Sequence, residues 1–222
     1  MSRIEAIVSD FGGVLTTPLL GAFAGLQQTH GIPLEAFGAA LARAAANDGG
    51  VNPLFELETG RISEATFLTQ LGTALEAELG RTVELEGFGA SFFEHLHPNE
   101  ELFAFMRTLH GRGYRMAILT NNVREWEPLW RSMLPIDELF ELVVDSGFVG
   151  VRKPAPEIYE LTLERLGLPA EATLFLDDIE VNCDAARALG MQAIWYRSTA
   201  QAIADVEAAL AGQFSEPSRS QQ

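Results

Sequence analysis

The sequence predicts an α/β protein: a parallel β-sheet with helices on both faces, and an all-helical segment inserted after the first strand. From residue 98 onward, short β-branched apolar runs alternate with amphipathic segments, a rhythm typical of a parallel sheet. Between residues 19 and 97, by contrast, only helical patterns occur. We therefore expect a core of residues 1–16 and 98–212, a helical domain of residues 17–97, and a disordered tail of residues 213–222.

The first strand is expected where Ile4 to Val8 form an apolar, β-branched run. The run ends at Asp10, and a bare carboxylate at the end of a buried strand is costly unless a positive group meets it. Gly12 and Gly13 then let the chain turn sharply and leave backbone N–H and C=O groups open to an anion or a metal. An ordinary strand-to-helix turn, with Asp10 as a helix cap, is the alternative interpretation.

Periodicity and end signals place the remaining elements. Ser63 is a candidate helix N-cap, and Gly80 and Gly167 are stop signals. Helices are expected over residues 19–30, 34–46, 64–79, 84–95, 98–109, 125–134, 157–166, 182–189 and 200–210. Further strands are expected over residues 114–119, 142–144, 173–176 and 192–196, with a polar loop over residues 145–156.

Charge and composition exclude several classes of function. The 222 residues are 47% hydrophobic and 21% charged, as in an ordinary globular protein, and the formal net charge is −16. This charge disfavours sequence-independent binding to nucleic acid or to anionic membranes. Cys183 is the single cysteine, so no intrachain disulfide can form, and neither a signal peptide nor a membrane-spanning run is visible. We expect a cytoplasmic protein with a small-molecule partner; the sequence predicts no oligomeric state.

Polar side chains stand at the ends of several predicted strands. Because the carboxyl ends of parallel strands meet at one edge of a sheet, these side chains are expected around one crevice. Crowded carboxylates repel one another unless a cation sits among them, and hard oxygen ligands select Mg²⁺. The set comprises Asp10, Thr120, Asn121, Asp177 and Asp178, with Lys153 from the loop of residues 145–156.

This set suggests phosphate chemistry. The Lys153 ammonium, the Thr120 hydroxyl and the Asn121 amide suit the oxygens of a phosphoryl group. With charge neutralised around it, Asp10 can approach phosphorus as a nucleophile and form an aspartyl-phosphate. Asn182 is expected either to support the metal site or to cap a turn. Glu58 and Arg61 are expected either to form a surface pair or to point at the substrate.

Four short motifs occur in a fixed order, and together they carry a family resemblance. They are Asp10-Phe11-Gly12-Gly13-Val14-Leu15, Leu119-Thr120-Asn121, Lys153-Pro154 and Asp177-Asp178. In this order, over about residues 4–200, the sequence resembles the haloacid dehalogenase-like (HAD) hydrolase superfamily. The segments Val151 to Tyr159 and Leu176 to Asn182 are similar to the phosphatase domain at the N-terminus of soluble epoxide hydrolases.

The resemblance implies a Rossmann-like core with a helical cap over the site. It implies Asp10 as the nucleophile, assisted by Thr120 and Lys153. It implies Mg²⁺ held by Asp10, the backbone carbonyl of Gly12 and Asp178, with Asp177 in close support. It implies that the substrate phosphate is held by Thr120, Asn121, Lys153 and Gly13.

One position departs from the family pattern. Most phosphatases of this superfamily carry a second Asp two residues after the nucleophile, where it protonates the leaving group and later activates water. Gly12 stands at this position and has no side chain for acid–base work. Because such help is typically worth about a hundred- to ten-thousandfold, we expect low activity on poor leaving groups and competence on good ones. The proton would come from water, the substrate or a cap residue.

The predicted function is a Mg²⁺-dependent phosphomonoester hydrolase that acts on a small phosphorylated metabolite. Three alternatives stay open: a 2-haloacid dehalogenase, a phosphomutase, and a non-catalytic binding protein, which Gly12 favours. The Asp177-Asp178 pair counts against a dehalogenase, which needs no metal, and the missing acid–base Asp counts against a mutase. The lining of the cap is predicted to include Phe23, Phe55, Arg61 and Trp126.

Overall fold

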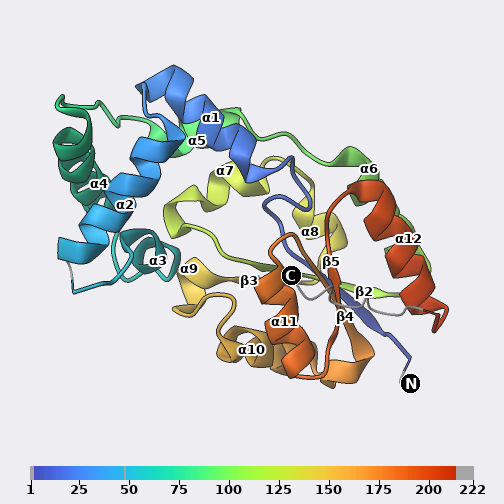
Figure 1. Ribbon diagram of the computed structural model, residues 1–222. Helices are drawn as coiled ribbons and strands as arrows, with labels where there is room; N and C mark the ends of the chain where they lie inside the picture. Colours follow the sequence, from blue (N-terminus) through green and yellow to red (C-terminus); the bar gives the residue numbers. More distant parts are fainter. Residues whose placement is uncertain (1–2, 48, 214–222) are drawn as a thin grey trace, which may run out of the picture.

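A single parallel sheet organises the core. The computed structural model describes residues 3–47 and 49–213 (Figure 1). The sheet has five strands in the order β3-β2-β1-β4-β5, all parallel, which confirms the predicted α/β class. Each predicted strand is present, with small shifts at its ends. The strands are β1 (Ala6–Ser9), β2 (Arg115–Thr120), β3 (Leu142–Asp145), β4 (Thr173–Asp177) and β5 (Gln192–Trp195).

Strand β1 lies at the centre of the sheet, between β2 and β4. Its four residues are all buried, because helices cover both faces of the sheet. Ile7 packs on one face, while Ala6 and Val8 pack on the other. Ser9 is in register with Ile118 of β2 and with Leu176 of β4. The central position therefore fixes Asp10, which follows β1, at the carboxyl edge of the sheet.

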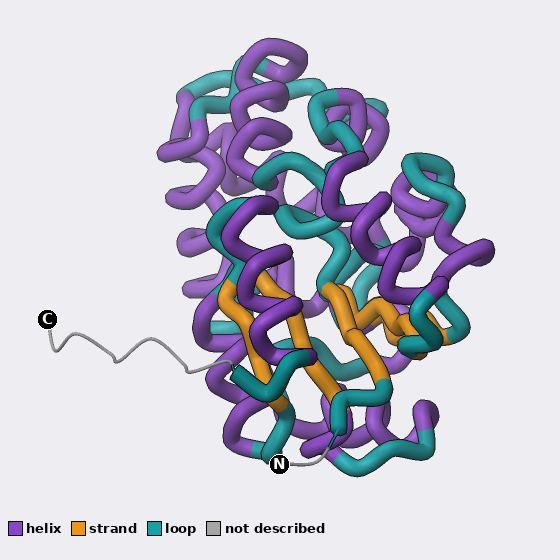
Figure 2. The backbone as a smooth tube through the Cα atoms, turned by 90° about the vertical axis from the view of Figure 1, so that its right-hand side faces the viewer, coloured by secondary structure: helices purple, strands orange, loops and turns teal. Residues whose placement is uncertain are grey.

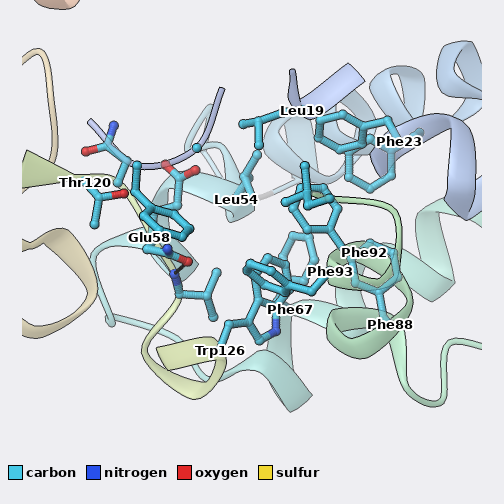
Figure 3. A pocket seen from close by; sticks show the side chains of 17 residues that line it. Leu19, Phe23, Leu54, Glu58, Phe67, Phe88, Phe92, Phe93, Thr120 and Trp126 are labelled. Atoms are coloured by element: carbon cyan, nitrogen blue, oxygen red, sulfur yellow. Dashed lines mark hydrogen bonds between the residues drawn. The ribbon is translucent and has the colours of Figure 1, made fainter. Parts of the chain in front are cut away.

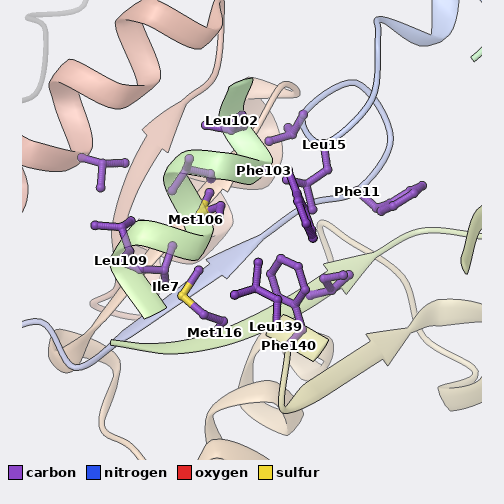
Figure 4. Packing of buried hydrophobic residues seen from close by; sticks show 14 of the residues in the cluster. Ile7, Phe11, Leu15, Leu102, Phe103, Met106, Leu109, Met116, Leu139 and Phe140 are labelled. Atoms are coloured by element: carbon purple, nitrogen blue, oxygen red, sulfur yellow. The ribbon is translucent and has the colours of Figure 1, made fainter. Parts of the chain in front are cut away.

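Helices cover the two faces of the sheet (Figure 2). On one face lie α6 (Glu100–Gly111) and α12 (Thr199–Leu210), and on the other lie α10 (Pro156–Leu166) and α11 (Glu180–Ala188). Figure 4 shows the first of these interfaces, where Met106 and Leu109 of α6 pack towards Ile7 and Met116 of the sheet. The amphipathic pattern of residues 98–109 predicted this helix and its buried side.

Helices α1 to α5 form the cap, which has an apolar cluster of its own. Ser63 caps α4 as predicted, since its Oγ accepts the backbone N–H of Thr66 at 3.2 Å. Val123 and Trp126, from the segment after β2, join the cap cluster. The predicted domain bounds stay a proposal, which these separate clusters support. The helices are α1 (Leu19–His30), α2 (Leu34–Asn47), α3 (Pro53–Glu58), α4 (Glu64–Leu79) and α5 (Phe88–Glu94).

Several short elements differ from the sequence prediction. The helix expected over residues 125–134 is shorter and begins as a 3₁₀ turn, because Pro128 fits only the first turn of a helix. A four-residue helix, capped by Asp145, lies in the segment expected to be a polar loop. Periodicity cannot detect helices of this length. These elements are η1 (Arg124–Trp126), α7 (Glu127–Arg131), α8 (Ile136–Leu139), α9 (Ser146–Val149) and η2 (Ala170–Ala172).

Two further expectations concern the tail and the membrane. The tail predicted over residues 213–222 lies outside the described residues except for Gln213. Among the helices that the structure describes, none combines the length and the apolar character needed to cross a bilayer.

Candidate active site

The carboxyl edge of the sheet brings together acidic groups that are distant in sequence. Asp10 follows β1, while Asp177 ends β4 and Asp178 comes directly after it. One ligand atom from each of these carboxylates lies within 4.8 Å of the other two. Thr120 ends β2, the strand beside β1. The structure thus places the predicted carboxylates together, and Thr120 lies at the end of the adjacent strand.

Lys153 is the cation of this cluster. Its side chain is 1% exposed, and its Nζ lies 2.8 Å from Asp10 Oδ1 and 2.6 Å from Asp177 Oδ2. Burial alone would lower the pKa of Lys153, but Asp10 and Asp177 outweigh burial and raise the pKa. The lysine therefore stays protonated. An ammonium has three N–H donors, so one donor is left after it has donated to both carboxylates.

Asn121 positions Lys153 through the backbone. The Lys153 N–H donates to Asn121 Oδ1 at 2.8 Å, and Asn121 Nδ2 donates to the Lys153 carbonyl at 3.0 Å. Both ends of the amide are used, which ties the end of β2 to the loop that carries the lysine. The predicted contact of Asn121 with phosphate therefore stays a prediction, while its role in placing Lys153 was not foreseen from the sequence.

The two oxygens of Asp10 have different surroundings. Oδ1 accepts the Phe11 N–H at 2.7 Å as well as the Lys153 ammonium. Oδ2 accepts no hydrogen bond from the residues that the structure describes. Burial raises the pKa of Asp10, and the carboxylates of Asp177 and Asp178 raise it further, whereas the Lys153 ammonium lowers it. A divalent cation beside Asp10 would favour its ionised form, with Oδ2 free to react.

Asp177 and Asp178 have different roles. Asp177 is fully buried, and its Oδ1 accepts the Ile179 N–H at 2.8 Å and Asn182 Nδ2 at 3.0 Å, while Oδ2 faces Lys153. Both of its oxygens are occupied, which fits the predicted supporting role. Asp178 is less buried, and burial followed by the charge of Asp177 raises its pKa to about 6. Asn182 thus donates to a carboxylate of the acidic cluster, and its support of a metal site stays a prediction.

The glycine turn after Asp10 closely approaches the carboxylate of Asp178. Gly13 has a φ of +81°, which a side chain rarely adopts, and a Cβ there would lie 2.3 Å from Asp178 Oδ2. The sequence analysis expected an open N–H at this turn, but the Gly13 N–H donates to Thr16 Oγ1 at 2.9 Å. A contact of Gly13 with phosphate therefore stays a prediction. The absence of a side chain at Gly13 lets the turn approach the Asp178 carboxylate.

The chemistry of these groups fits a divalent cation. Three carboxylates and one ammonium leave two negative charges in a largely buried cluster. Such crowding is relieved when a cation sits among the carboxylates, and Mg²⁺ prefers hard oxygen ligands of this kind. Within the described part of the chain, the Asp178 carboxylate accepts no hydrogen bond from another residue, so it is the carboxylate of the cluster best placed to bind a cation.

A cavity of about 90 Å³ adjoins this cluster on the side of the cap (Figure 3). Its polar end is formed by Gly12, Thr120, Asn121 and Asn122. The Thr120 hydroxyl makes no side-chain hydrogen bond within the described part of the chain, although the residue is 1% exposed. The remaining wall consists mainly of aromatic side chains of the cap: Phe23, Phe37, Phe67, Phe88, Phe92 and Phe93.

The predicted cap lining is right for two residues and wrong for the other two. Phe23 and Trp126 line the cavity. Phe55 and Arg61 instead line a separate surface groove between α3 and residues 150–157. Phe55 is 44% exposed, and Arg61 pairs with Glu56 at 2.9 Å. The prediction for Phe55 failed because the face of α3 that meets the core depends on how the cap docks, and Arg61 follows α3 and is held by Glu56.

Glu58 lines the cavity but does not pair with Arg61. Its Oε2 accepts Arg152 Nε at 2.7 Å, and the two side chains are only 17% and 22% exposed. Burial raises the pKa of Glu58, and the charge of Arg152 lowers it in part. This pair joins the cap to the residue before Lys153. Arg152 was not among the predicted site residues, and its polar neighbour is 94 positions away, so no local pattern marked it.

Comparison with known proteins identifies the class. The family model described as "haloacid dehalogenase-like hydrolase" matches residues 4–190, so the chain belongs to this family. Phosphatase MT3486 from Mycobacterium tuberculosis is 31% identical over 198 residues, which cover 86% of each protein. The HAD family enzyme BT-2542 from Bacteroides thetaiotaomicron has the same fold, with a TM-score of 0.69 at 22% identity over 88% of this chain and 95% of that one. These matches confirm the predicted superfamily.

Other relatives are longer than the matched region. Acyl-CoA dehydrogenase family member 10 from Mus musculus is 30% identical over 214 residues, which are 93% of this chain but 19% of that protein. The glyceraldehyde 3-phosphate phosphatase of Pyrococcus abyssi and bifunctional epoxide hydrolase 2 of Rattus norvegicus match over 44% and 22% of their lengths. The chain thus spans less than half the length of these curated relatives.

Proposed function

We propose that the protein is a Mg²⁺-dependent phosphomonoester hydrolase that acts on a small phosphorylated metabolite through Asp10. The asymmetry of the Asp10 carboxylate carries this proposal. One oxygen is held by the Phe11 N–H and the Lys153 ammonium, while the other makes no hydrogen bond with the described residues. A carboxylate fixed in this way presents a single oxygen for attack.

The reaction has two steps. Asp10 Oδ2 forms a bond to phosphorus while the bond from phosphorus to the ester oxygen breaks, and the departing oxygen takes a proton from water. A water molecule then attacks phosphorus and gives a proton to the hydroxide left by the first step, the bond to Asp10 breaks, and inorganic phosphate leaves. The Thr120 hydroxyl and the third N–H of Lys153 would hold the phosphoryl oxygens.

The metal would be held by Asp10, Asp178 and the Gly12 carbonyl, with Asp177 in support. When bound, Mg²⁺ supplies positive charge that neutralises the phosphoryl oxygens and the crowded carboxylates. Lys153 and Asn182 keep Asp177 in place from either side. Positioning and neutralisation of charge supply most of the rate in phosphoryl transfer, which suits a site without an acid–base side chain at position 12.

The comparisons support this proposal. Relatives include a phosphatase from Mycobacterium tuberculosis and glyceraldehyde 3-phosphate phosphatase from Pyrococcus abyssi. The Bacteroides thetaiotaomicron enzyme has been solved in complex with magnesium and inorganic phosphate. L-2-haloacid dehalogenases share the fold as well, but the acidic cluster around Asp178 favours a metal-dependent reaction. The cytoplasmic location and the absence of nucleic-acid and membrane partners stay predictions.

Hydrolysis of 4-nitrophenyl phosphate tests the proposal. We expect release of phosphate with Mg²⁺, none with EDTA, and none from Asp10→Asn with Mg²⁺. Asp137→Asn is the matched control, because this side chain is 85% exposed and lies outside the acidic cluster. Metal-independent release of halide from 2-chloropropionate would favour a dehalogenase instead. Inertness towards a broad panel of phosphate esters would favour a binding protein.

A further inference from the structure

The cavity beside the site has a polar end and an apolar end. Gly12, Thr120, Asn121 and Asn122 form the polar end, next to the carboxylate that would receive the phosphoryl group. Figure 3 shows Thr120 and Glu58 at one end and Phe23, Phe92 and other cap aromatics at the other. A phosphate ester held at the polar end would therefore project its leaving group among the aromatic rings.

The apolar end has few groups that could bind a polar substrate. The Trp126 indole N–H is already donated to Glu64 Oε1 at 2.7 Å. Glu58 is the only charged residue among the described residues that line the cavity, and its charge is balanced by Arg152. A sugar hydroxyl buried here would lose its hydrogen bonds to water without replacement, at a cost of roughly tenfold or more in affinity for each hydroxyl.

The size of the cavity limits the leaving group further. Its volume is about 90 Å³. An engineered apolar cavity of about 150 Å³ binds benzene. A short branched chain fits the cavity here, and a single ring fits with small shifts of the walls. A nucleoside or a long acyl chain is too large.

The apolar wall continues up to Gly12. At Gly12, a Cβ would lie 3.1 Å from Leu19 Cδ2, so Leu19 occupies the space beside the position where related phosphatases carry an acid. The leaving oxygen then departs next to hydrocarbon rather than next to a proton donor. Acidic alcohols and phenols leave more readily under these conditions than basic alcohols.

We infer that the substrate carries a compact, uncharged, apolar leaving group, either a single ring or a short branched chain, and that phenols are preferred. This inference rests on the proposed phosphatase function and adds the substrate class. It predicts poor activity on three classes of substrate: sugar phosphates, nucleotides and phosphate esters of long acyl chains.

Three substrates separate the two parts of the inference. Benzyl phosphate and glycerol 2-phosphate both release alkoxides, so their comparison isolates the effect of the apolar pocket. We expect kcat/KM to be about 10- to 100-fold higher for benzyl phosphate, the gain from burying a ring of this size. Phenyl phosphate releases a more acidic alcohol, and we expect its kcat to exceed that of benzyl phosphate. Equal or higher kcat/KM for glycerol 2-phosphate or glucose 6-phosphate would overturn the inference and leave the phosphatase function intact.

A pair of variants tests the pocket itself. Leu54→Trp fills the cavity, whereas Leu68→Trp adds the same side chain to the same apolar cluster outside the cavity lining. We expect Leu54→Trp to raise KM for benzyl phosphate at least tenfold without changing inhibition by inorganic phosphate, and Leu68→Trp to change neither. An unchanged KM in a folded Leu54→Trp protein would overturn the inference.

Binding can be measured without turnover. Benzylphosphonate should raise the midpoint of thermal unfolding more than methylphosphonate does, in the wild-type protein and in Leu68→Trp but not in Leu54→Trp. Equal shifts with the two phosphonates would overturn the pocket assignment. Failure to hydrolyse any phosphate ester, with the benzylphosphonate shift intact, would overturn the proposed function and leave the pocket assignment standing.

Discussion

Gly13→Ala should disable the proposed metal site by moving Asp178. The added Cβ would lie 2.3 Å from Asp178 Oδ2, whereas an ordinary contact needs at least 3.4 Å, so the carboxylate must move by about 1.1 Å. Changes that misplace metal ligands typically cost about 10- to 100-fold in metal affinity, and a misplacement of about 1 Å at a reacting centre can cost about 100-fold in rate. We expect losses of this size in Mg²⁺ affinity and in kcat.

The backbone cost of the same substitution must be separated from this effect. Gly13 has a φ of +81° and Gly113 a φ of +93°, and a Cβ at Gly113 meets nothing within 4 Å. Either alanine should therefore lower the free energy of unfolding by roughly 1–2 kcal/mol through backbone strain. Only Gly13→Ala should also weaken Mg²⁺ binding.

The assay combines three measurements on the two variants: urea unfolding, Mg²⁺ binding by calorimetry, and the Mg²⁺ dependence of 4-nitrophenyl phosphate hydrolysis. If Gly13→Ala binds Mg²⁺ as tightly as the wild-type protein does, the close approach of Gly13 to Asp178 has no role in binding the metal. Equal weakening in both variants would instead trace the loss to general destabilisation.

Three further predictions concern charge. Burial raises the pKa of Asp145 to about 6, so between about pH 4 and pH 6 the folded protein holds a proton that the unfolded chain has released. As the pH rises through this range, the free energy of unfolding should therefore fall by about 3 kcal/mol relative to that of Asp145→Asn. The same pH dependence of urea unfolding in both proteins would contradict this. Lys153→Met should cost about 3–5 kcal/mol in urea unfolding, because it leaves the buried Asp10 and Asp177 unpaired; a loss below about 1 kcal/mol would refute this reason. Mg²⁺ at about 100 times its dissociation constant should raise the free energy of unfolding by about 2.7 kcal/mol, an effect that Asp178→Asn should lose in a thermal unfolding assay.

The sequence predicted those features that depend on local patterns. Each strand of the sheet is a short apolar run with a clear end, and the polar residue at that end is a local signal. For this reason the sequence alone assigns Asp10, Thr120 and Asp178 to one edge of the sheet. The family resemblance added the order of the motifs and the helical cap.

The remaining features depend on how distant segments dock. The pair of Glu58 and Arg152 spans 94 positions, and neither residue lies in a pattern that points to the other. Helix α3 has six residues, too few for periodicity to show which side faces the core, so Phe55 was wrongly assigned to the cavity. The hydrogen bonds between the Asn121 amide and the Lys153 backbone could likewise not be predicted, because sequence alone does not show which group a side-chain amide contacts.

The central place of β1 has a consequence for how the chain is made. Ser9 pairs with Ile118 and Leu176, so the strand that emerges first from the ribosome must wait for both neighbours. At typical synthesis rates of about 5–20 residues per second, the second neighbour follows roughly 10 to 30 s later. During that interval the nascent strand is exposed, while the cap helices, which lie between β1 and β2, are already available to fold locally. We expect newly made protein to become active only after β4 has been released.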